Sequence, residues 1–493
     1  MPKAIIIGAG VAGIATAIRL AIKGYQVEIF EANAYPGGKL SEFSQDGFRF
    51  DAGPSLLTMP QYIDELFSLA GRNPKDYFEY QRLPIICQYF YPDGSKITAW
   101  ADQEKFVEEL SKATFEPKEN LIRGIENSAK IYRATHEVFL ESSLHQFKTF
   151  FSKKGFRALF RLSQIDSKRT MHRANESFFR SKKLVQFFDR YATYNGSDPY
   201  RAPATLNVIP HLEQHYGAWF PTGGMYAIVK SLVKLAKELG VNFNFNNPVN
   251  SIILENKKAV GIKASNGIHK ADIIVSNSDV WCTYKRLLAN HPELHPDKLL
   301  NQARSSSALI FYWGIKKQFE QLDLHNIFFS KDYKAEFDAI WQQQTISPDP
   351  TVYLNISSKL EPGDAPEGCE NWFVMINVPA NNGQDWDALI NEAKKNILKK
   401  LSDALKEDIA GLIVSESVLD PRSIESKTSS YQGSIYGTSS NDRFAAFLRH
   451  ANKSSKINNL LFCGGSVHPG GGIPLCLLSA KIVGELAPIP STR

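Results

Sequence analysis

The sequence predicts an α/β fold built around a Rossmann-like nucleotide-binding domain, and three observations carry this prediction. A strand, a glycine turn, a helix and a second strand follow one another within residues 4–31. Strand patterns return at residues 241–276, and a strand, a glycine-rich loop and a helix fill residues 460–486. At 493 residues, the chain is long enough for two or three lobes around one large domain.

The composition excludes several classes of protein. A hydrophobic content of 43% with 22% charged residues supplies enough apolar surface for a core and excludes wholesale disorder. The five cysteines form no CxxC pair, so neither a disulfide framework nor a zinc finger is indicated, and a reducing compartment fits best. No apolar run reaches about 18 residues, so we expect no membrane-spanning helix.

The N-terminal βαβ unit carries a dinucleotide-binding pattern, GAGVAG, at residues 8–13. Its glycines permit a tight turn, the approach of the backbone to a pyrophosphate, and close packing of helix on strand. Free N–H groups at the start of the helix attract the phosphates. An acidic residue at the end of the second strand is placed to accept hydrogen bonds from a ribose diol. The predicted contacts are Gly8, Gly10, Val11, Ala12, Gly13, Glu31 and Ala32.

A second glycine pair follows this unit and identifies the dinucleotide. Residues 36–40, PGGKL, resemble the GG motif of FAD enzymes of the glutathione-reductase and amine-oxidase type, which NAD dehydrogenases usually lack. FAD is therefore the predicted cofactor. Residues 53–55 lie along the flavin in such proteins, and a Gly-Pro turn with an Asx cap is the alternative interpretation. The predicted contacts here are Gly37, Gly38, Lys39, Leu40, Gly53, Pro54 and Ser55.

The middle of the chain predicts a return to this domain. A loop at residues 219–225 opens a helix that ends near Gly240, and short strands then follow as far as Ser276. In flavoproteins of this type the strand that begins at Val249 commonly touches the adenine through its backbone. We therefore expect Val249 and Ser276 to contact the cofactor. The strand patterns cover residues 241–245, 249–254, 259–264 and 271–276.

Outside the nucleotide fold, period-two alternation predicts a mixed sheet that forms a second lobe. A hairpin is expected over residues 81–100 and helices over residues 103–140, and further strands at residues 308–313, 352–356 and 372–378. The predicted division is an FAD-binding domain from residues 1–75, 215–285 and 446–493, a substrate domain from residues 76–140 and 286–445, and a helical lobe at residues 141–214.

A basic and aromatic stretch runs from Lys148 to Arg190. It holds twelve lysines and arginines, three acidic residues and eight phenylalanines. Three hypotheses are open. An interfacial element, in which the cations meet anionic headgroups and the phenylalanines enter the acyl boundary, is favoured. An ordinary solvated pair of helices comes second. A nucleic-acid surface is not expected, because no RNP, helix-turn-helix or finger signature accompanies the charge.

The C-terminal loop aims a second helix N-terminus at the flavin. Five glycines lie between the strand at residues 460–463 and the helix from residue 475. A positive helix end stabilises the negative charge that the N1–C2=O edge of a reduced flavin carries, although the glycines alone could serve tight turns. No metal site is predicted, because the pair His211 and His215 does not form HExxH. The predicted cofactor contacts are Gly465, Ser466, Gly472, Ile473 and Pro474.

These motifs together resemble the bacterial-type phytoene desaturase family of carotenoid desaturases. The likeness runs nearly end to end, through GAGVAG with its acidic partner, PGGKL, FRFDAGPS, FPTGGM and INNLLFCGGSVHPGGGIP. The ending HPGGGIPL is similar to the 1-hydroxycarotenoid 3,4-desaturase branch, whereas phytoene desaturases proper more often have HPGAGIPG.

The resemblance implies a reaction of carotenoid biosynthesis. FAD would take a hydride at N5 from an acyclic, 1-hydroxylated carotenoid, and a C=C bond would form. A quinone or oxygen would reoxidise the flavin, since no second nucleotide fingerprint is visible. His468 is a candidate proton acceptor, and a turn-stabilising role is the alternative.

Other reactions of the same family stay open: desaturation of phytoene or diapophytoene, oxidation of a terminal methyl group, and isomerisation. A different class is a non-catalytic prenyl-lipid chaperone on the same fold. A carotenoid lives in the bilayer, so we expect a cytoplasmic protein bound peripherally to the inner face of the membrane.

Overall fold

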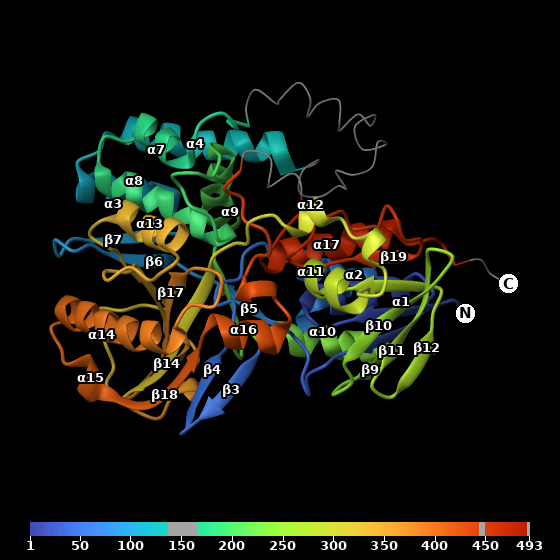
Figure 1. The fold of residues 1–493 in the computed structure, drawn as a ribbon. Helices are drawn as coiled ribbons and strands as arrows, with labels where there is room; N and C mark the ends of the chain where they lie inside the picture. The colour runs from blue at the N-terminus through green and yellow to red at the C-terminus, as the bar shows by residue number, and fades with distance from the viewer. Residues whose placement is uncertain (137–164, 443–448, 491–493) are drawn as a thin grey trace.

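A computed structural model describes residues 1–136, 165–442 and 449–490 of the chain. Two α/β parts lie side by side, and a group of helices caps one of them (Figure 1). The part that holds both termini is built on a parallel sheet, and the other part is built on a mixed sheet.

The parallel sheet has five strands, and its centre is buried on both faces. Along β1, Ala4 and Ile6 pack with the helices, whereas Ile5 and Ile7 pack with a second, smaller sheet. This two-sided burial explains the continuous apolar run that begins the chain. Across the sheet the strands are β19 (Leu460–Phe462), β13 (Ile273–Ser276), β1 (Lys3–Ile7), β2 (Gln26–Phe30) and β9 (Asn242–Asn244). The helices of this part are α1 (Val11–Ile22), α2 (Gln61–Leu69), α10 (Ala227–Glu238) and α17 (Ile473–Leu486).

The smaller sheet is antiparallel and separate from the parallel one. Its strands are β10 (Val249–Glu255), β11 (Lys258–Ala264) and β12 (Gly267–Lys270). Asn256 and Lys257 both have positive φ, 49° and 59°, as a two-residue hairpin turn between β10 and β11 requires. The four strands predicted over residues 241–276 are therefore confirmed as strands, but only the first and last of them join the parallel sheet.

The mixed sheet has seven strands. One face of β14 and β17 packs against the long helix α14 (Trp386–Leu405), and the other face carries Ala308, Ile310, Tyr312 and Phe373 toward the nucleotide-binding part. All three strands predicted for this lobe are confirmed, and the predicted hairpin joins the same sheet. In order, the strands are β18 (Ile413–Leu419), β14 (Ser307–Ile315), β17 (Glu370–Val378), β16 (Val352–Asn355), β15 (His325–Phe328), β6 (Ile85–Phe90) and β7 (Lys96–Trp100).

Short elements connect the two parts. β3 (Glu42–Gln45) and β4 (Phe48–Asp51) form a hairpin, and β5 (Tyr80–Arg82) pairs antiparallel with β8 (Trp219–Pro221), which lies far along the chain. The short helices are α11 (Val280–Cys282), α12 (Asp297–Leu300), α13 (Tyr333–Asp338), α15 (Ile409–Leu412) and α16 (Pro421–Thr428). The domain boundaries given by the sequence stay a prediction.

The capping helices bury the aromatic residues of the basic stretch. Phe179, Phe187 and Phe188 are at most 4% exposed; in the core of this lobe Phe188 stacks on Phe179 and meets Phe187 edge to face. The expectation that these phenylalanines face acyl chains is therefore wrong for these three, while residues 148–164 of the stretch lie outside the described part. No helix of the described residues is long and apolar enough to cross a membrane. The helices are α3 (Gln103–Thr114), α4 (Lys118–Thr135), α7 (Met171–Phe178), α8 (Lys182–Asp189) and α9 (Ile209–Tyr216).

Candidate functional site

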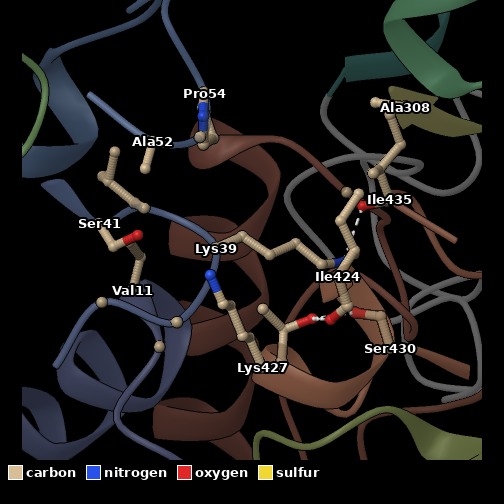
Figure 2. Close-up of a pocket in the computed structure, with 18 of the residues that line it drawn as sticks. Val11, Lys39, Ser41, Ala52, Pro54, Ala308, Ile424, Lys427, Ser430 and Ile435 are labelled. Carbon is tan, nitrogen blue, oxygen red and sulfur yellow. Dashed lines mark hydrogen bonds between the residues drawn. The ribbon is translucent and has the colours of Figure 1, made fainter. Parts of the chain in front are cut away.

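A cavity of about 1090 Å³ lies between the two α/β parts, and Figure 2 shows a portion of its wall. Its lining comes from the beginning, the middle and the end of the chain, so the fold brings together stretches that the sequence keeps far apart. The predicted contacts that line it are Gly8, Gly10, Val11, Ala12, Glu31, Ala32, Gly37, Gly38, Lys39, Leu40, Gly53, Pro54, Ser55, Val249, Gly465, Ser466, Gly472, Ile473 and Pro474.

The first glycine turn leaves a helix end open toward the cavity. Helix α1 begins after Gly10, with no side-chain cap and no acidic residue in its first turn. A Cβ atom on Gly13 would lie 2.3 Å from the carbonyl oxygen of Gly8, so only glycine lets the helix pack this closely on the strand. The uncapped N–H groups and the helix dipole fit a pyrophosphate.

Glu31 ends strand β2 and is 7% exposed. Its carboxylate accepts a hydrogen bond from the backbone N–H of Ala9 at 2.7 Å, and two more from the backbone and side-chain nitrogens of Asn33, both at 2.9 Å. These bonds tie the end of β2 to the glycine turn. Oε2 accepts only the bond from Ala9 and keeps acceptor capacity for a ribose hydroxyl at the cavity wall.

The second glycine pair lies directly against the first turn. The backbone N–H of Gly37 donates to Ala9 O at 2.7 Å, and Gly10 and Gly37 form a parallel bridge. Gly53 approaches the same loop so closely that a Cβ atom there would lie 1.8 Å from the carbonyl oxygen of Lys39. Residues 8–13, 37–40 and 53–55 therefore form one continuous cradle of backbone.

Lys39 places a half-buried positive charge in this cradle. Its ammonium group donates to the carbonyl oxygens of Ser434 at 3.3 Å and Ile435 at 2.9 Å, across the cavity wall (Figure 2). No carboxylate of the described residues lies within salt-bridge distance of it. Burial lowers the pKa of Lys39 to about 8, although the nearby Asp279 acts in the opposite direction. An anionic ligand such as a dinucleotide would supply the missing negative charge.

A buried arginine that the sequence did not reveal holds the C-terminal loop. Arg449 donates to the carbonyl oxygens of Tyr436 at 2.8 Å and Gly465 at 3.2 Å. Burial lowers its pKa to about 10. Helix α17, which follows this loop, has no side-chain cap and no acidic residue in its first turn. Its open N-terminus faces the cavity, as the flavin hypothesis requires.

Three predicted residues do not line the cavity. Gly13 packs α1 on β1, and the hydroxyl of the buried Ser276 bonds to Thr283 at 2.7 Å. His468 is 1% exposed, its backbone N–H donates to His450 O, and its carbonyl accepts from the side chain of Asn452. This setting favours the turn-stabilising interpretation of His468 over a proton acceptor.

Polar residues of the substrate-domain wall were not predicted from the sequence. Arg190, His325 and Tyr353 line the cavity, and Tyr353 lies 2.7 Å from Ser55, a predicted contact. They come from three separate elements, and Arg190 lies more than a hundred residues before the other two, so no local motif joins them. The isolated histidine of β15 was the one available signal.

Metal-binding side chains do not gather in the described residues, where no group of three or more His, Cys, Asp or Glu side chains could hold an ion. The rings of His211 and His215 stack on each other at 4.8 Å. Burial raises the pKa of both Cys463 and Cys476, to about 12 and about 11, which leaves them as thiols; Cys463 packs in the interior, whereas Cys476 lines the cavity.

Comparison with known proteins identifies the family. Residues 11–485 match the model of the flavin containing amine oxidoreductases. The chain belongs to this family. The prediction of FAD is thereby confirmed, and the glycine cradle, Glu31 and Lys39 are the residues that fit it.

Two curated relatives carry the resemblance further. The chain is 50% identical over 488 residues to a 1-hydroxycarotenoid 3,4-desaturase of a Flavobacterium species, with 99% of both chains covered. It is 35% identical to a 4,4'-diapolycopene oxygenase of a Methylomonas species, over 98% of this chain and 97% of that one. The resemblance to carotenoid desaturases is confirmed.

Solved structures agree on the fold. An oxidoreductase from Methanosarcina mazei superposes with a TM-score of 0.64 at 16% identity, over 98% of this chain and 100% of that one. At this identity the similarity shows the architecture alone.

Proposed function

We propose that this protein is an FAD-dependent carotenoid desaturase that introduces a C=C bond into an acyclic, 1-hydroxylated carotenoid. The observation that carries the proposal is the composition of the cavity. Past the glycine cradle it continues along the mixed sheet, where Ala308, Ile310, Phe373 and Met375 line it. Its volume of about 1090 Å³ lies at the upper end of the usual range for ligand pockets, about 300–1,000 Å³, and suits a large ligand such as a dinucleotide with room beside it for an apolar substrate.

Positioning does most of the chemical work in this proposal. Bound FAD supplies a hydride acceptor. The chain has to hold an allylic C–H bond of the polyene against it and to exclude water, which the apolar strand faces of β14 and β17 accomplish. Conjugation weakens that C–H bond and stabilises the cation that hydride loss leaves. An adjacent carbon then loses a proton to a weak base as the C=C bond forms, so no strong protein acid or base is needed.

Product analysis of the purified protein tests the proposal. FAD-loaded protein is mixed anaerobically with matched hydroxylated and unhydroxylated acyclic carotenoids. We expect the flavin absorption to bleach and the hydroxylated substrate to lose two hydrogens. A terminal aldehyde in a parallel aerobic reaction, a geometric isomer formed with reduced FAD, or desaturation of the unhydroxylated carotenoid would instead assign one of the other family reactions. Protein that binds polyene without any bleaching would point to a lipid chaperone.

The electron acceptor is proposed to be a quinone or oxygen. No second dinucleotide fingerprint is present in the sequence, which disfavours a bound nicotinamide. Reoxidation of the bleached flavin is followed after addition of either acceptor, and NAD(P)⁺ serves as the comparison.

We further propose that the protein collects its substrate at a membrane surface. Phe115, between α3 and α4, is 93% exposed, and Lys112 and Lys118 lie within three residues of it. An exposed aromatic ring beside cations suits the interface of an anionic bilayer. Phe115→Ser is expected to lower the partition coefficient onto phosphatidylglycerol vesicles about tenfold, because a buried Phe contributes roughly 1.5–3 kcal/mol.

The control for this experiment is Ile268→Ser on β12, where the side chain is 66% exposed but far from the capping helices (Figure 1). Co-sedimentation measures both variants. Equal binding of Phe115→Ser and wild-type protein would remove this docking site.

A further inference from the structure

One part of the cavity wall combines apolar side chains with a few buried polar ones. We call these the end-group cluster: Ser55, Arg190, His325, Tyr353 and Asn355. Ser55, Arg190, His325 and Asn355 are at most 9% exposed, and Tyr353 is half-buried. Ser55, Arg190, His325 and Tyr353 line the cavity directly, and Ile86 and Ile327 lie among them. Polar groups in such a wall have to be satisfied by one another or by a ligand.

The hydrogen bonds of His325 fix which of its nitrogens carries the proton. Nδ1 lies 3.1 Å from the amide nitrogen of Asn355, and that amide also donates to Leu324 O at 3.0 Å. An amide nitrogen only donates, so Nδ1 accepts and the proton sits on Nε2. Burial, together with the positive charge of Arg190, lowers the pKa of His325 to about 3, so the ring is neutral.

A chain of hydrogen bonds leads from the glycine cradle to this ring. The hydroxyl of Tyr353 lies 2.8 Å from Nδ1 of His325, whose lone pair it shares with the Asn355 amide, and 2.7 Å from the hydroxyl of Ser55. The Nε2–H group stands at the far end of the chain. It is buried and has no hydrogen-bond partner among the described residues. A buried donor that is left without a hydrogen bond costs about 1–3 kcal/mol of stability.

Arg190 presents a second donor of the same kind. Its guanidinium lies over the rings of Tyr89, Tyr191 and Tyr194, and one terminal nitrogen donates to Tyr89 at 2.7 Å. Its Nε–H has no partner within the described part of the chain. A carboxylate oxygen of Glu213 lies 3.9 Å from a terminal guanidinium nitrogen of Arg190 and balances the charge of the arginine. The Nε2–H of His325 and the Nε–H of Arg190 are therefore two donors at a site with no net charge. Such a site suits a neutral oxygen acceptor.

We propose that Nε2 of His325 binds the hydroxyl oxygen of the substrate end group and so selects hydroxylated carotenoids. This inference rests on the proposed function and names the residue behind its specificity. In a 1-hydroxycarotenoid, C2 alone separates the hydroxyl-bearing carbon from the C3–C4 bond. A residue that binds the hydroxyl must consequently lie close to the flavin, and His325 is two hydrogen bonds from Ser55, which is expected along it.

Binding of a matched pair of polyenes tests this role without turnover. The pair has equal length and is already fully desaturated, and only one member carries the tertiary hydroxyl. Quenching of protein tryptophan fluorescence gives Kd for FAD-loaded protein. We expect wild-type protein to prefer the hydroxylated polyene about tenfold. His325→Leu should reduce this preference to near one. His325→Gln should recover part of it, because its amide restores an N–H donor.

His295→Leu is the matched control. His295 is equally buried, at 8% exposure, and its Nδ1 also has no partner in the described residues, but it does not line the cavity. Its replacement should leave the preference unchanged.

An unchanged preference in His325→Leu, or no preference in wild-type protein, overturns the inference. The inference is also overturned if His325→Leu keeps the preference but has a higher KM for a quinone. The oxygen that binds Nε2 would then belong to the electron acceptor and not to the carotenoid. The proposed function fails in a different way. In that case the hydroxylated polyene is preferred, yet its precursor, which lacks the C3–C4 double bond, is never converted.

Discussion

Gly53→Ala is expected to weaken FAD binding about tenfold or more. The new Cβ atom would lie 1.8 Å from the carbonyl oxygen of Lys39, which is a backbone atom and cannot turn aside as a side chain can. Overpacking of this kind costs about 1–3 kcal/mol. Relief requires residues 37–40 or 53–55 to shift, and both line the cavity. Titration of the apoprotein with FAD, followed by flavin fluorescence, measures Kd.

Gly363→Ala is the control for Gly53→Ala. No atom lies within 4 Å of a Cβ atom at Gly363, and the residue does not line the cavity. Its Kd for FAD should stay within about twofold of wild type, which corresponds to well under 1 kcal/mol. If Gly53→Ala binds FAD as tightly as Gly363→Ala, the cradle does not hold the cofactor.

Glu31→Gln should raise the Kd for FAD about 10- to 100-fold, although glutamine has nearly the same shape. One carboxylate oxygen accepts from Ala9 and the other from Asn33. A glutamine amide has a single oxygen, so its NH₂ group must face one of these donors. Hydrogen bonds to a charged group contribute about 1.5–3 kcal/mol, and the glycine turn loses one of its anchors. Equilibrium titration with FAD measures the effect.

The control for Glu31→Gln is Glu28→Gln on the same strand. Glu28 pairs with Lys3 at 2.8 Å near the surface and has no part in the cavity. Exposed pairs contribute about 0–1 kcal/mol, so this variant should bind FAD almost as wild type does. Equal affinities of the two variants would show that the carboxylate of Glu31 is dispensable for the dinucleotide.

Local patterns were sufficient for the nucleotide end of the site. The glycines at residues 8, 10 and 13, the acidic residue at the end of β2 and the uncapped start of α17 are all features of short segments. Their spacing reports backbone geometry directly, because a tight turn or a close approach admits little besides glycine. All of β1, α1 and β2 therefore lie where the sequence predicts them.

Side chains at the ends of motifs were less predictable. Ser276 ends a strand, and the residues that follow it in the chain line the cavity. Its own hydroxyl nevertheless points into the core and bonds to Thr283. His468 stands within the glycine loop, yet its backbone binds His450 and Asn452. Which face a residue presents depends on the packing of the next layer, and a motif does not contain that layer.

The sequence by itself determined the cofactor class and the family, because the glycine spacing and the alternation of strands and helices are patterns of residues close together in the chain. Only the tertiary structure decided how the substrate wall is built. Strand β15 pairs in parallel with β6, more than two hundred residues earlier in the chain, and this pairing places His325 beside the cavity that Arg190 and Tyr353 also reach. Such long-range contacts arise from burial of whole sheet faces, for which no single segment carries the information.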